Sequence, residues 1–186
     1  MYSNKVCSGS VSPWAEGRAV VILGIDPGLA IVGWGVLDCC AGKFKTLGYG
    51  SIQTPAGTRT EERLAMIYKE LNAIIDHFNP EEMAVEELFF TNNVTTGIRV
   101  AEARGIVLLC AEQKGVRVSE YTPMQVKQAV VGYGKAEKKQ VIAMVTSILK
   151  LPKPPKPDDA ADAVAIAICH AHSSSSAMAK YFNQRK

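Results

Sequence analysis

The sequence predicts an α/β protein in which one mixed β-sheet is flanked by helices. Residues 20–53 contain three apolar or alternating segments separated only by short turns, a pattern typical of antiparallel strands. Beyond residue 60, further apolar segments alternate with stretches of helical periodicity, which is typical of parallel strands joined by helices. We therefore expect three antiparallel strands, then two parallel strands, in one domain without internal repeats.

The first two expected strands lie on either side of a Pro-Gly turn in residues 20–37, VVILGIDPGLAIVGWGVL. Residues 20–25 are almost continuously apolar and rich in β-branched side chains, which indicates a strand buried on both faces. The turn follows, and residues 31–37 return beside the first strand as a hairpin. Asp26 ends the first strand, where a buried charge is costly unless it has a partner. The alternative is that Asp26 only caps the turn.

The third strand and the first helix follow directly. Residues 44–53 are expected to be the third strand. Thr60 is a candidate N-cap, and apolar residues then recur at helical spacing over residues 64–78, which predicts an amphipathic helix. The Asn-Pro pair at residues 79–80 ends it.

The rest of the chain alternates between short strands and helices. The expected strands are residues 83–88 and 116–121. The expected helices are residues 94–114, 123–131, 136–149 and 159–172, the first of them with an N-cap among residues 91–93. Gly97 and Gly105 would let another helix approach closely, as at a packing or subunit interface. Four prolines in residues 151–157 predict a stiff connector before the last helix.

Composition limits the class of protein. No apolar run approaches the roughly 20 residues of a membrane span. Residues 1–19 lack the apolar core of a secretory signal and are expected to be a disordered extension before a single domain at residues 20–172. A flexible tail is expected at residues 173–186. Five cysteines, an odd number without a CxxC pair, argue against a disulfide framework or zinc site and predict a cytoplasmic protein.

The charge distribution is more informative than the net charge of +3. Residues 81–113 carry six Glu and two Arg, whereas residues 114–157 carry nine Lys or Arg and two Glu. Such a chain can present both a metal site and a phosphate-binding surface. The alternative is that these charges lie on unrelated solvated faces.

Isolated acids stand beside apolar segments at three places. Asp26 and Glu86 each end an apolar strand, and the alternation of strand side chains places Glu86 and Glu87 on opposite faces. Asp159 and Asp162 are three residues apart at the start of the last helix, so they share a helix face in front of a buried apolar run. The helix dipole favours negative charge there.

Each acid has a simpler explanation by itself. Asp158 or Asp159 could be an N-cap, and Glu86 could be half-exposed at a strand end. Carboxylates gathered in one place repel one another unless cations hold them, however, and a set of oxygen ligands suits Mg²⁺ or Mn²⁺ rather than zinc. Two such ions could activate a water and stabilise the leaving oxygen in phosphodiester cleavage.

Five segments together resemble RuvC, the bacterial family of Holliday-junction resolvases (crossover junction endodeoxyribonucleases). They read GIDPG, AVEELFF, EARG, QVKQAVVGYGKAEKKQV and DAADAVAIAICHAH, and the resemblance as a whole extends over about residues 20–172. The resemblance implies an RNase H-like fold, in agreement with the strand order expected above. By position it also implies that Asp26, Glu86, Asp159 and Asp162 are the catalytic, metal-binding carboxylates. The connector before the last helix is one residue longer than the family pattern, and Asp158 and Asp162, four residues apart, could also share a face.

The resemblance implies an enzyme that binds two Mg²⁺ ions per subunit, with Mn²⁺ as a substitute and Asp26 bridging both. It implies a homodimer that makes two symmetric nicks, in strands of like polarity, in a four-way DNA junction during recombination and repair. The products would carry 5′-phosphate and 3′-hydroxyl ends. The helix at residues 94–114 is where the resemblance places the dimer contact, and a RuvA–RuvB branch-migration complex is the implied partner.

Three further positions resemble family residues that contact DNA. Lys127 and Lys138 would supply point charges for phosphate, although any single lysine is more often a solvated surface charge. Phe89 matches an aromatic residue that stacks on an unpaired base, unless it packs in the core with its neighbour. His170 and His172 lie two residues apart and do not share a helix face, so we expect structural or surface roles for both.

Three other functions are compatible with parts of the sequence. Actin-like and sugar-kinase ATPases share the strand topology, but they need a second lobe for which 186 residues leave no room. A junction-binding module without catalysis would gain nothing from collecting negative charge. An RNase H-like nuclease that acts on RNA would use the same chemistry, and only the family-like segments argue against it.

Overall fold

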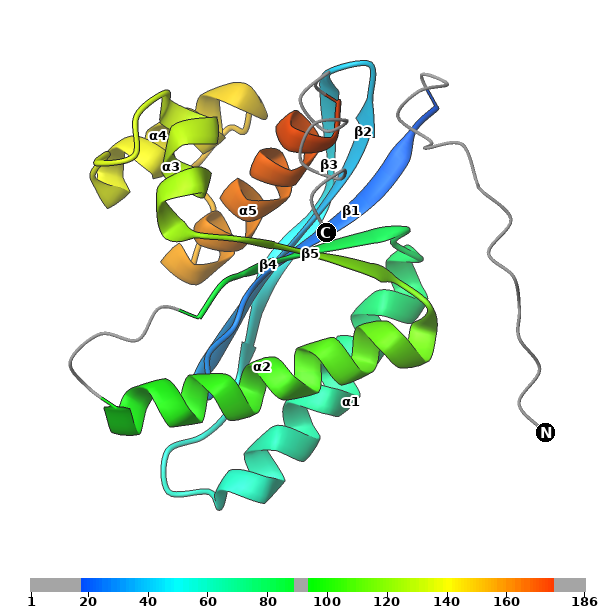
Figure 1. Ribbon diagram of the computed structural model, residues 1–186, viewed down its shortest axis with the longest axis vertical. Coiled ribbons are helices and arrows are strands. Elements are labelled where there is room, and N and C mark those ends of the chain that lie inside the picture. Colours follow the sequence, from blue (N-terminus) through cyan, green and yellow to red (C-terminus); the bar gives the residue numbers. More distant parts are fainter. Residues whose placement is uncertain (1–17, 89–93, 176–186) are drawn as a thin grey trace, which may run out of the picture.

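The computed structural model describes residues 18–88 and 94–175, and these form one five-stranded sheet with helices on both faces (Figure 1). The strands are β1 (Val20–Asp26), β2 (Ile31–Cys40), β3 (Lys43–Gln53), β4 (Glu82–Glu86) and β5 (Arg117–Tyr121). The helices are α1 (Thr60–Phe78), α2 (Val94–Lys114), α3 (Pro123–Val131), α4 (Lys138–Ile148) and α5 (Asp158–Ser175).

The strand order is β3-β2-β1-β4-β5. The strands β1, β2 and β3 pair antiparallel, whereas β4 pairs parallel to β1 and β5 pairs parallel to β4. The predicted mixed sheet is therefore confirmed. The parallel register pairs Ile25 with Val85, so the next residue of each strand, Asp26 and Glu86, reaches the same edge of the sheet.

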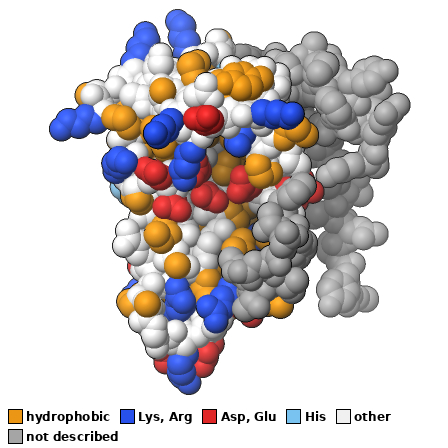
Figure 2. All heavy atoms as spheres, turned by 90° about the vertical axis from the view of Figure 1, so that its left-hand side faces the viewer, with side chains coloured by type: hydrophobic (Ala, Val, Ile, Leu, Met, Phe, Trp, Pro, Cys, Tyr) orange, Lys and Arg blue, Asp and Glu red, His pale blue; other side chains and the backbone are white. Residues whose placement is uncertain are grey.

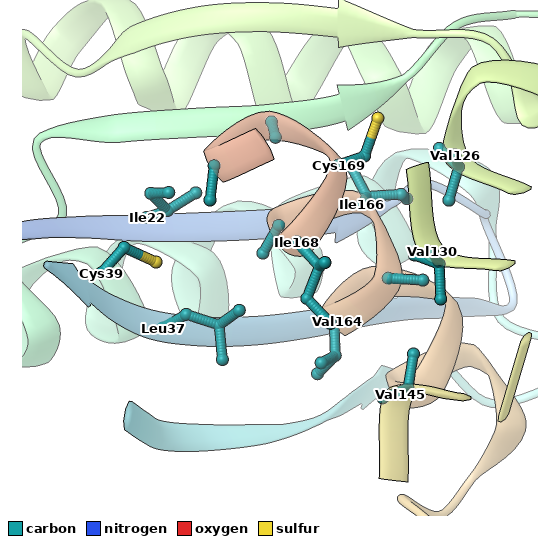
Figure 3. Close-up of a cluster of buried hydrophobic side chains, with 14 of the residues drawn as sticks. Ile22, Leu37, Cys39, Val126, Val130, Val145, Val164, Ile166, Ile168 and Cys169 are labelled. Carbon is teal, nitrogen blue, oxygen red and sulfur yellow. The ribbon is translucent and has the colours of Figure 1, made fainter. Parts of the chain in front are cut away.

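The sheet separates two apolar cores. On one face α5 lies against β1 and β2 and is covered by α3 and α4, and Figure 3 shows Val126, Val130 and Ile166 meeting there. On the other face α1 and α2 cover the second core (Figure 1). Strand β1 supplies Ile22 to the first core and Leu23 to the second, which explains why its sequence is apolar without alternation.

Helix α5 lies very close to the sheet because the strands beneath it carry glycine. A Cβ atom at Gly24 would overlap the backbone oxygen of Ala163, and one at Gly33 would overlap that of Asp159. No larger residue fits at these points without moving the helix. The glycines therefore set the height of the first turns of α5 above the sheet.

Several expected boundaries are wrong by one to three residues. Strand β2 continues to Cys40 rather than residue 37, and α5 continues to Ser175, so the first three residues of the expected tail are helical. Strand β4 ends at Glu86 rather than residue 88, α4 begins at Lys138 rather than residue 136, and α5 begins at Asp158. Thr60 is the first residue of α1 and not its cap, because Arg59 takes the N-cap position and binds Glu62 through its guanidinium. Glu137 forms a capping box with Gln140, which fixes the later start of α4.

Some expectations fall on other parts of the chain. The extension expected at residues 1–19 lies almost wholly outside the described residues, as do the N-cap expected among residues 91–93 and most of the tail at residues 173–186. Across the described ranges, no helix combines the length and the apolarity needed to cross a membrane.

Candidate functional site

Three acids from different elements meet at the edge where β1 and β4 end. Asp26, Glu86 and Asp162, the last from the second turn of α5, line one pocket together with Lys127 of α3 and Lys138 of α4. We call this the acid pocket. Its remaining wall is largely apolar and consists of Pro123, Val126, Val141, Ala165 and Ile166. Figure 2 shows Asp and Glu side chains gathered in the middle of this face, with Lys and Arg side chains above and below them.

Burial and mutual repulsion dominate the electrostatics of the acid pocket. Burial, together with the charges of Glu86, Asp162 and Asp159, raises the pKa of Asp26 from 3.8 to about 7. Burial and the charge of Asp162 also raise the pKa of Glu86, against the opposing effect of Lys127 and Lys138. Both carboxyl groups thus hold protons more tightly than they would in water, and added positive charge would stabilise their ionised forms.

Lys138 already supplies one positive charge to the acid pocket. Its Nζ atom lies 2.7 Å from Oδ2 of Asp162, and this hydrogen bond raises the pKa of the ammonium group. Lys138 is the first residue of α4, and the capping box in front of it fixes where that helix begins. The ammonium group therefore stands beside the acids, where it can also reach an approaching anion.

The two other acids of α5 have different surroundings. Asp159 does not line the acid pocket, although its charge contributes to the raised pKa of Asp26. It lines a second pocket, together with residues of the β1–β2 turn. Asp158 turns to Lys156, 3.0 Å away, and this hydrogen bond lowers the pKa of Asp158. The structure therefore groups Asp162 with Asp26 and Glu86, places Asp159 next to them, and gives Asp158 a partner of its own.

The acid pocket suits a divalent cation by its chemistry. Its ligand atoms are carboxylate oxygens, the donors that Mg²⁺ prefers, and the pKa values of Asp26 and Glu86 remain raised although Lys127 and Lys138 line the same pocket. In residues 18–88 and 94–175, no three acidic, His or Cys side chains already stand in an arrangement that would hold a metal ion. The pairing of Asp162 with Lys138 occupies one of the acids that such a group would need.

The pocket beside Asp159 was not expected from the sequence. It has a volume of about 380 Å³ and contains two arginines, Arg63 of α1 and Arg99 of α2. These residues are 36 positions apart and belong to no motif, so only the packing of α1 against α2 brings them to one place. Phe89, the predicted stacking residue, lies outside the described residues.

His170 and His172 have structural surroundings, as expected. His170 is buried and forms hydrogen bonds with the hydroxyl of Tyr121, at 2.8 Å, and with Oε2 of Glu82, at 2.5 Å. Arg117 binds the other oxygen of Glu82. This network links the first residues of β4 and β5, Glu82 and Arg117, to His170 of α5, which also binds Tyr121 at the end of β5. His172 is exposed and lies 3.2 Å from the backbone oxygen of Ala129.

Comparisons with known proteins agree with this geometry. Residues 22–170 match the family model described as crossover junction endodeoxyribonuclease RuvC. A curated relative of that name from Clostridioides difficile (strain 630) is 54% identical over 154 residues, which is 83% of this chain and 91% of the relative. One from Finegoldia magna is 53% identical over 165 residues, covering 89% and 99%.

Solved structures of Holliday junction resolvases also resemble this chain. The structure of Thermus thermophilus RuvC in complex with a Holliday junction substrate superposes with a TM-score of 0.80 at 39% identity, covering 84% of this chain and 95% of that one. The yeast mitochondrial Holliday junction resolvase superposes with a TM-score of 0.63 at 16% identity, a likeness of fold alone. Together with the strand order, these likenesses confirm the predicted RNase H-like fold.

Proposed function

The chain belongs to the RuvC family of crossover junction endodeoxyribonucleases, and from this premise we propose that it resolves four-way DNA junctions by paired, symmetric nicks in strands of like polarity. The observation that supports this most directly is the acid pocket, in which Asp26, Glu86 and Asp162 meet beside two lysines. A DNA-binding surface without chemistry would have no use for buried carboxylates, since they repel phosphate.

Asp26, Glu86, Asp159 and Asp162 would hold two Mg²⁺ ions, for which Mn²⁺ could substitute. Asp26 is the best placed of the four to bridge the ions, because it ends the central strand and the charges of the other three all act on it. When bound, the ions would supply an activated water for in-line attack on phosphorus and stabilise the leaving oxygen. Nicks with 5′-phosphate and 3′-hydroxyl ends would result, which a ligase can seal.

The lysines have the complementary role of binding the DNA. Lys127 lines the acid pocket from α3, and Lys138 can exchange its contact with Asp162 for one with a phosphate oxygen when the acids bind cations. This exchange would leave Asp162 available as a metal ligand at the moment when DNA arrives. We retain Phe89 as the residue that stacks on an unpaired base.

Cleavage assays with the full chain test this function. A labelled four-way junction, a linear duplex and an RNA–DNA hybrid would be incubated with Mg²⁺ or Mn²⁺, or with EDTA. We expect paired nicks in the junction that need a divalent metal and can be sealed by ligase. Binding of the junction without cutting in either metal would instead indicate a binding module, and preferred cutting of the hybrid would overturn the proposed substrate.

We also propose that two copies of the chain assemble through α2, because paired nicks need two active sites related by a two-fold axis. Two large apolar side chains of this helix are exposed, Ile98 by 52% and Leu109 by 46%. Glu102 and Gly105 lie between them at helical spacing, on the same face. A Cβ atom at Gly105 would meet nothing within 4 Å, so a second helix could approach closely there.

Replacing one of the two exposed apolar side chains of this face by a charged one should separate the two copies. Leu109→Glu is expected to convert a dimer into a monomer at micromolar concentration, because a carboxylate would be buried without a partner. Size-exclusion chromatography with light scattering measures this directly. Met144→Glu on α4, which also replaces an exposed apolar residue, should leave the dimer intact. A Leu109→Glu variant that remains dimeric would exclude this face as the interface.

The remaining proposals concern the cellular setting and the domain boundaries. We propose that the enzyme acts in the cytoplasm, in recombination and repair, together with a RuvA–RuvB branch-migration complex. A single catalytic domain would span residues 20–172, with short extensions on both sides.

A further inference from the structure

We infer that Arg63 and Arg99 form a second phosphate-binding subsite, which holds a backbone phosphate of the bound DNA strand next to the one that is cut. The pocket that contains them, here called the arginine pocket, is lined by Gly28, Leu29, Ala30, Ile31, Arg63, Arg99, Val100 and Asp159. This inference deepens the proposed nuclease function and rests on it for the identity of the ligand.

The two arginines differ from the other arginines that the structure describes. Arg18, Arg59, Arg104 and Arg117 each form an ion pair with a glutamate. In residues 18–88 and 94–175, neither Arg63 nor Arg99 has such a partner, although both line the same pocket. Asp159 is the one acid among the described residues that line this pocket, so the two guanidinium groups are only partly compensated and their convergence points to an anionic ligand.

Arg63 is held in place for this role. It is half-buried, and its Nε atom donates a 2.7 Å hydrogen bond to Oγ1 of Thr54. The hydroxyl of Thr54 in turn donates to the backbone oxygen of Leu29, in the β1–β2 turn, at 2.6 Å. The Nη groups of Arg63 make no hydrogen bond within the described ranges, so they can bind a ligand without disturbing this anchor. An anchored guanidinium loses little conformational entropy when it binds.

The location of the arginine pocket indicates which anion it binds. Asp159 lines the arginine pocket, and its charge acts on Asp26 in the acid pocket, so the two pockets are neighbours. Figure 2 shows the acids with basic side chains on both sides, above over α3 and α4 and below over the helices of the opposite face. A DNA strand that crosses this edge with one phosphate at the acids would bring a neighbouring phosphate toward the arginines.

The charge balance of the arginine pocket also favours phosphate. Asp159 contributes one negative charge, and the two arginines contribute two positive charges, so the pocket is net positive. The planar guanidinium group can bind two phosphate oxygens at once, which a lysine cannot do. The subsite would therefore fix the position of the strand along the edge of the sheet without reading its sequence.

Junction binding by Arg99→Gln tests this subsite, since Arg99 is exposed and its loss should not affect folding. Binding would be measured in EDTA over a range of salt concentrations, so that no cutting occurs. We expect about tenfold weaker binding and a salt slope reduced by about 1, as for the loss of one phosphate contact. The matched control is Lys69→Gln on α1, which removes the same charge from an exposed position and should change affinity less than about twofold. Equal effects of the two variants would overturn the inference.

A second measurement separates this subsite from the nuclease function. NMR signals of the arginine Nε–H groups would be followed while a four-nucleotide single-stranded DNA is added to the wild-type chain. The signals of Arg63 and Arg99 should shift, and that of Arg117, paired with Glu82, should not. If these signals shift in a chain that cuts no junction, the subsite stands and the nuclease proposal fails.

The opposite outcomes overturn the subsite and leave the nuclease proposal intact. In the first, the arginine signals do not shift although the chain cuts junctions. In the second, inorganic phosphate shifts these signals, but Arg99→Gln binds the junction as tightly as the wild type does. The last result would mean a general anion site.

Discussion

Asp26→Asn is expected to reduce junction cutting by at least about a thousandfold while junction binding is kept. The carboxylate ends the central strand, is acted on by the charges of the three other candidate ligands, and would bridge both metal ions. An amide of the same shape removes the charge that holds the ions, and a thousandfold loss corresponds to about 4 kcal/mol of transition-state stabilisation. Single-turnover cutting and equilibrium binding of one labelled junction measure the two effects separately.

The control for this variant is Glu87→Gln, at an exposed acid directly after Glu86. It removes one negative charge close to the site without touching the acid pocket, so cutting should change less than about twofold. An Asp26→Asn variant that cuts normally, or one that loses junction binding as well, would contradict a role of Asp26 in the chemistry alone.

In metal-free solution, Asp26→Asn should have a higher free energy of unfolding than the wild type, by an amount that depends on pH. The pKa of Asp26 is about 7 in the folded chain and 3.8 as its ordinary value, so the folded state binds this proton more tightly than the unfolded state does. Ionised Asp26 therefore lowers the free energy of unfolding of the wild type. This loss is absent below pH 3.8, grows between pH 3.8 and 7, and is complete above pH 7, where it is at most about 4 kcal/mol. Thermal unfolding in EDTA should therefore show Asp26→Asn above wild type at pH 8 and equal to it at pH 4.

The central acids of the site could be predicted from the sequence because local rules determine their positions. Asp26 and Glu86 each follow an apolar strand, and parallel strands end at the same edge of a sheet, so two local patterns are enough to bring them together. The position of Asp162 could be predicted because the apolar run that follows it in the helix must be buried against the sheet. Asp159 shows the limit of this reasoning, because residues three apart share only part of a helix face. Asp162 lines the acid pocket, whereas Asp159 lines the arginine pocket together with residues of the β1–β2 turn.

What could not be predicted depends on contacts between distant parts of the chain. Arg63 and Arg99 line the same pocket only because α1 packs on α2, and His170 forms a hydrogen bond with Glu82, 88 residues away in the sequence. Neither pair has a spacing that a sequence motif would reveal. The start of α1 differs by one residue from the prediction, since Arg59 and not Thr60 holds the N-cap position, and Arg59 pairs with Glu62.

The closeness of α5 to the sheet leads to the second large effect that we expect. Gly33 of β2 lies beside Asp26 in the register, and a methyl group on it would overlap the backbone oxygen of Asp159. Gly33→Ala must therefore push the first turn of α5 away from the strand. Because Asp159 and Asp162 both belong to the first turns of this helix, the change displaces two candidate metal ligands relative to Asp26.

We expect Gly33→Ala to cut junctions about a hundredfold more slowly, since displacing catalytic groups by about 1 Å can cost this much. The free energy of unfolding should fall by about 1–3 kcal/mol, as for other additions of a methyl group to a tightly packed core. Single-turnover cutting and thermal unfolding measure these effects, and circular dichroism verifies that the variant is folded. Gly105→Ala adds the same methyl group where nothing lies within 4 Å, so it should retain both cutting and stability. If Gly33→Ala is destabilised but cuts normally, the position of α5 does not control the acids, and the carboxylates must be aligned by the metal ions alone.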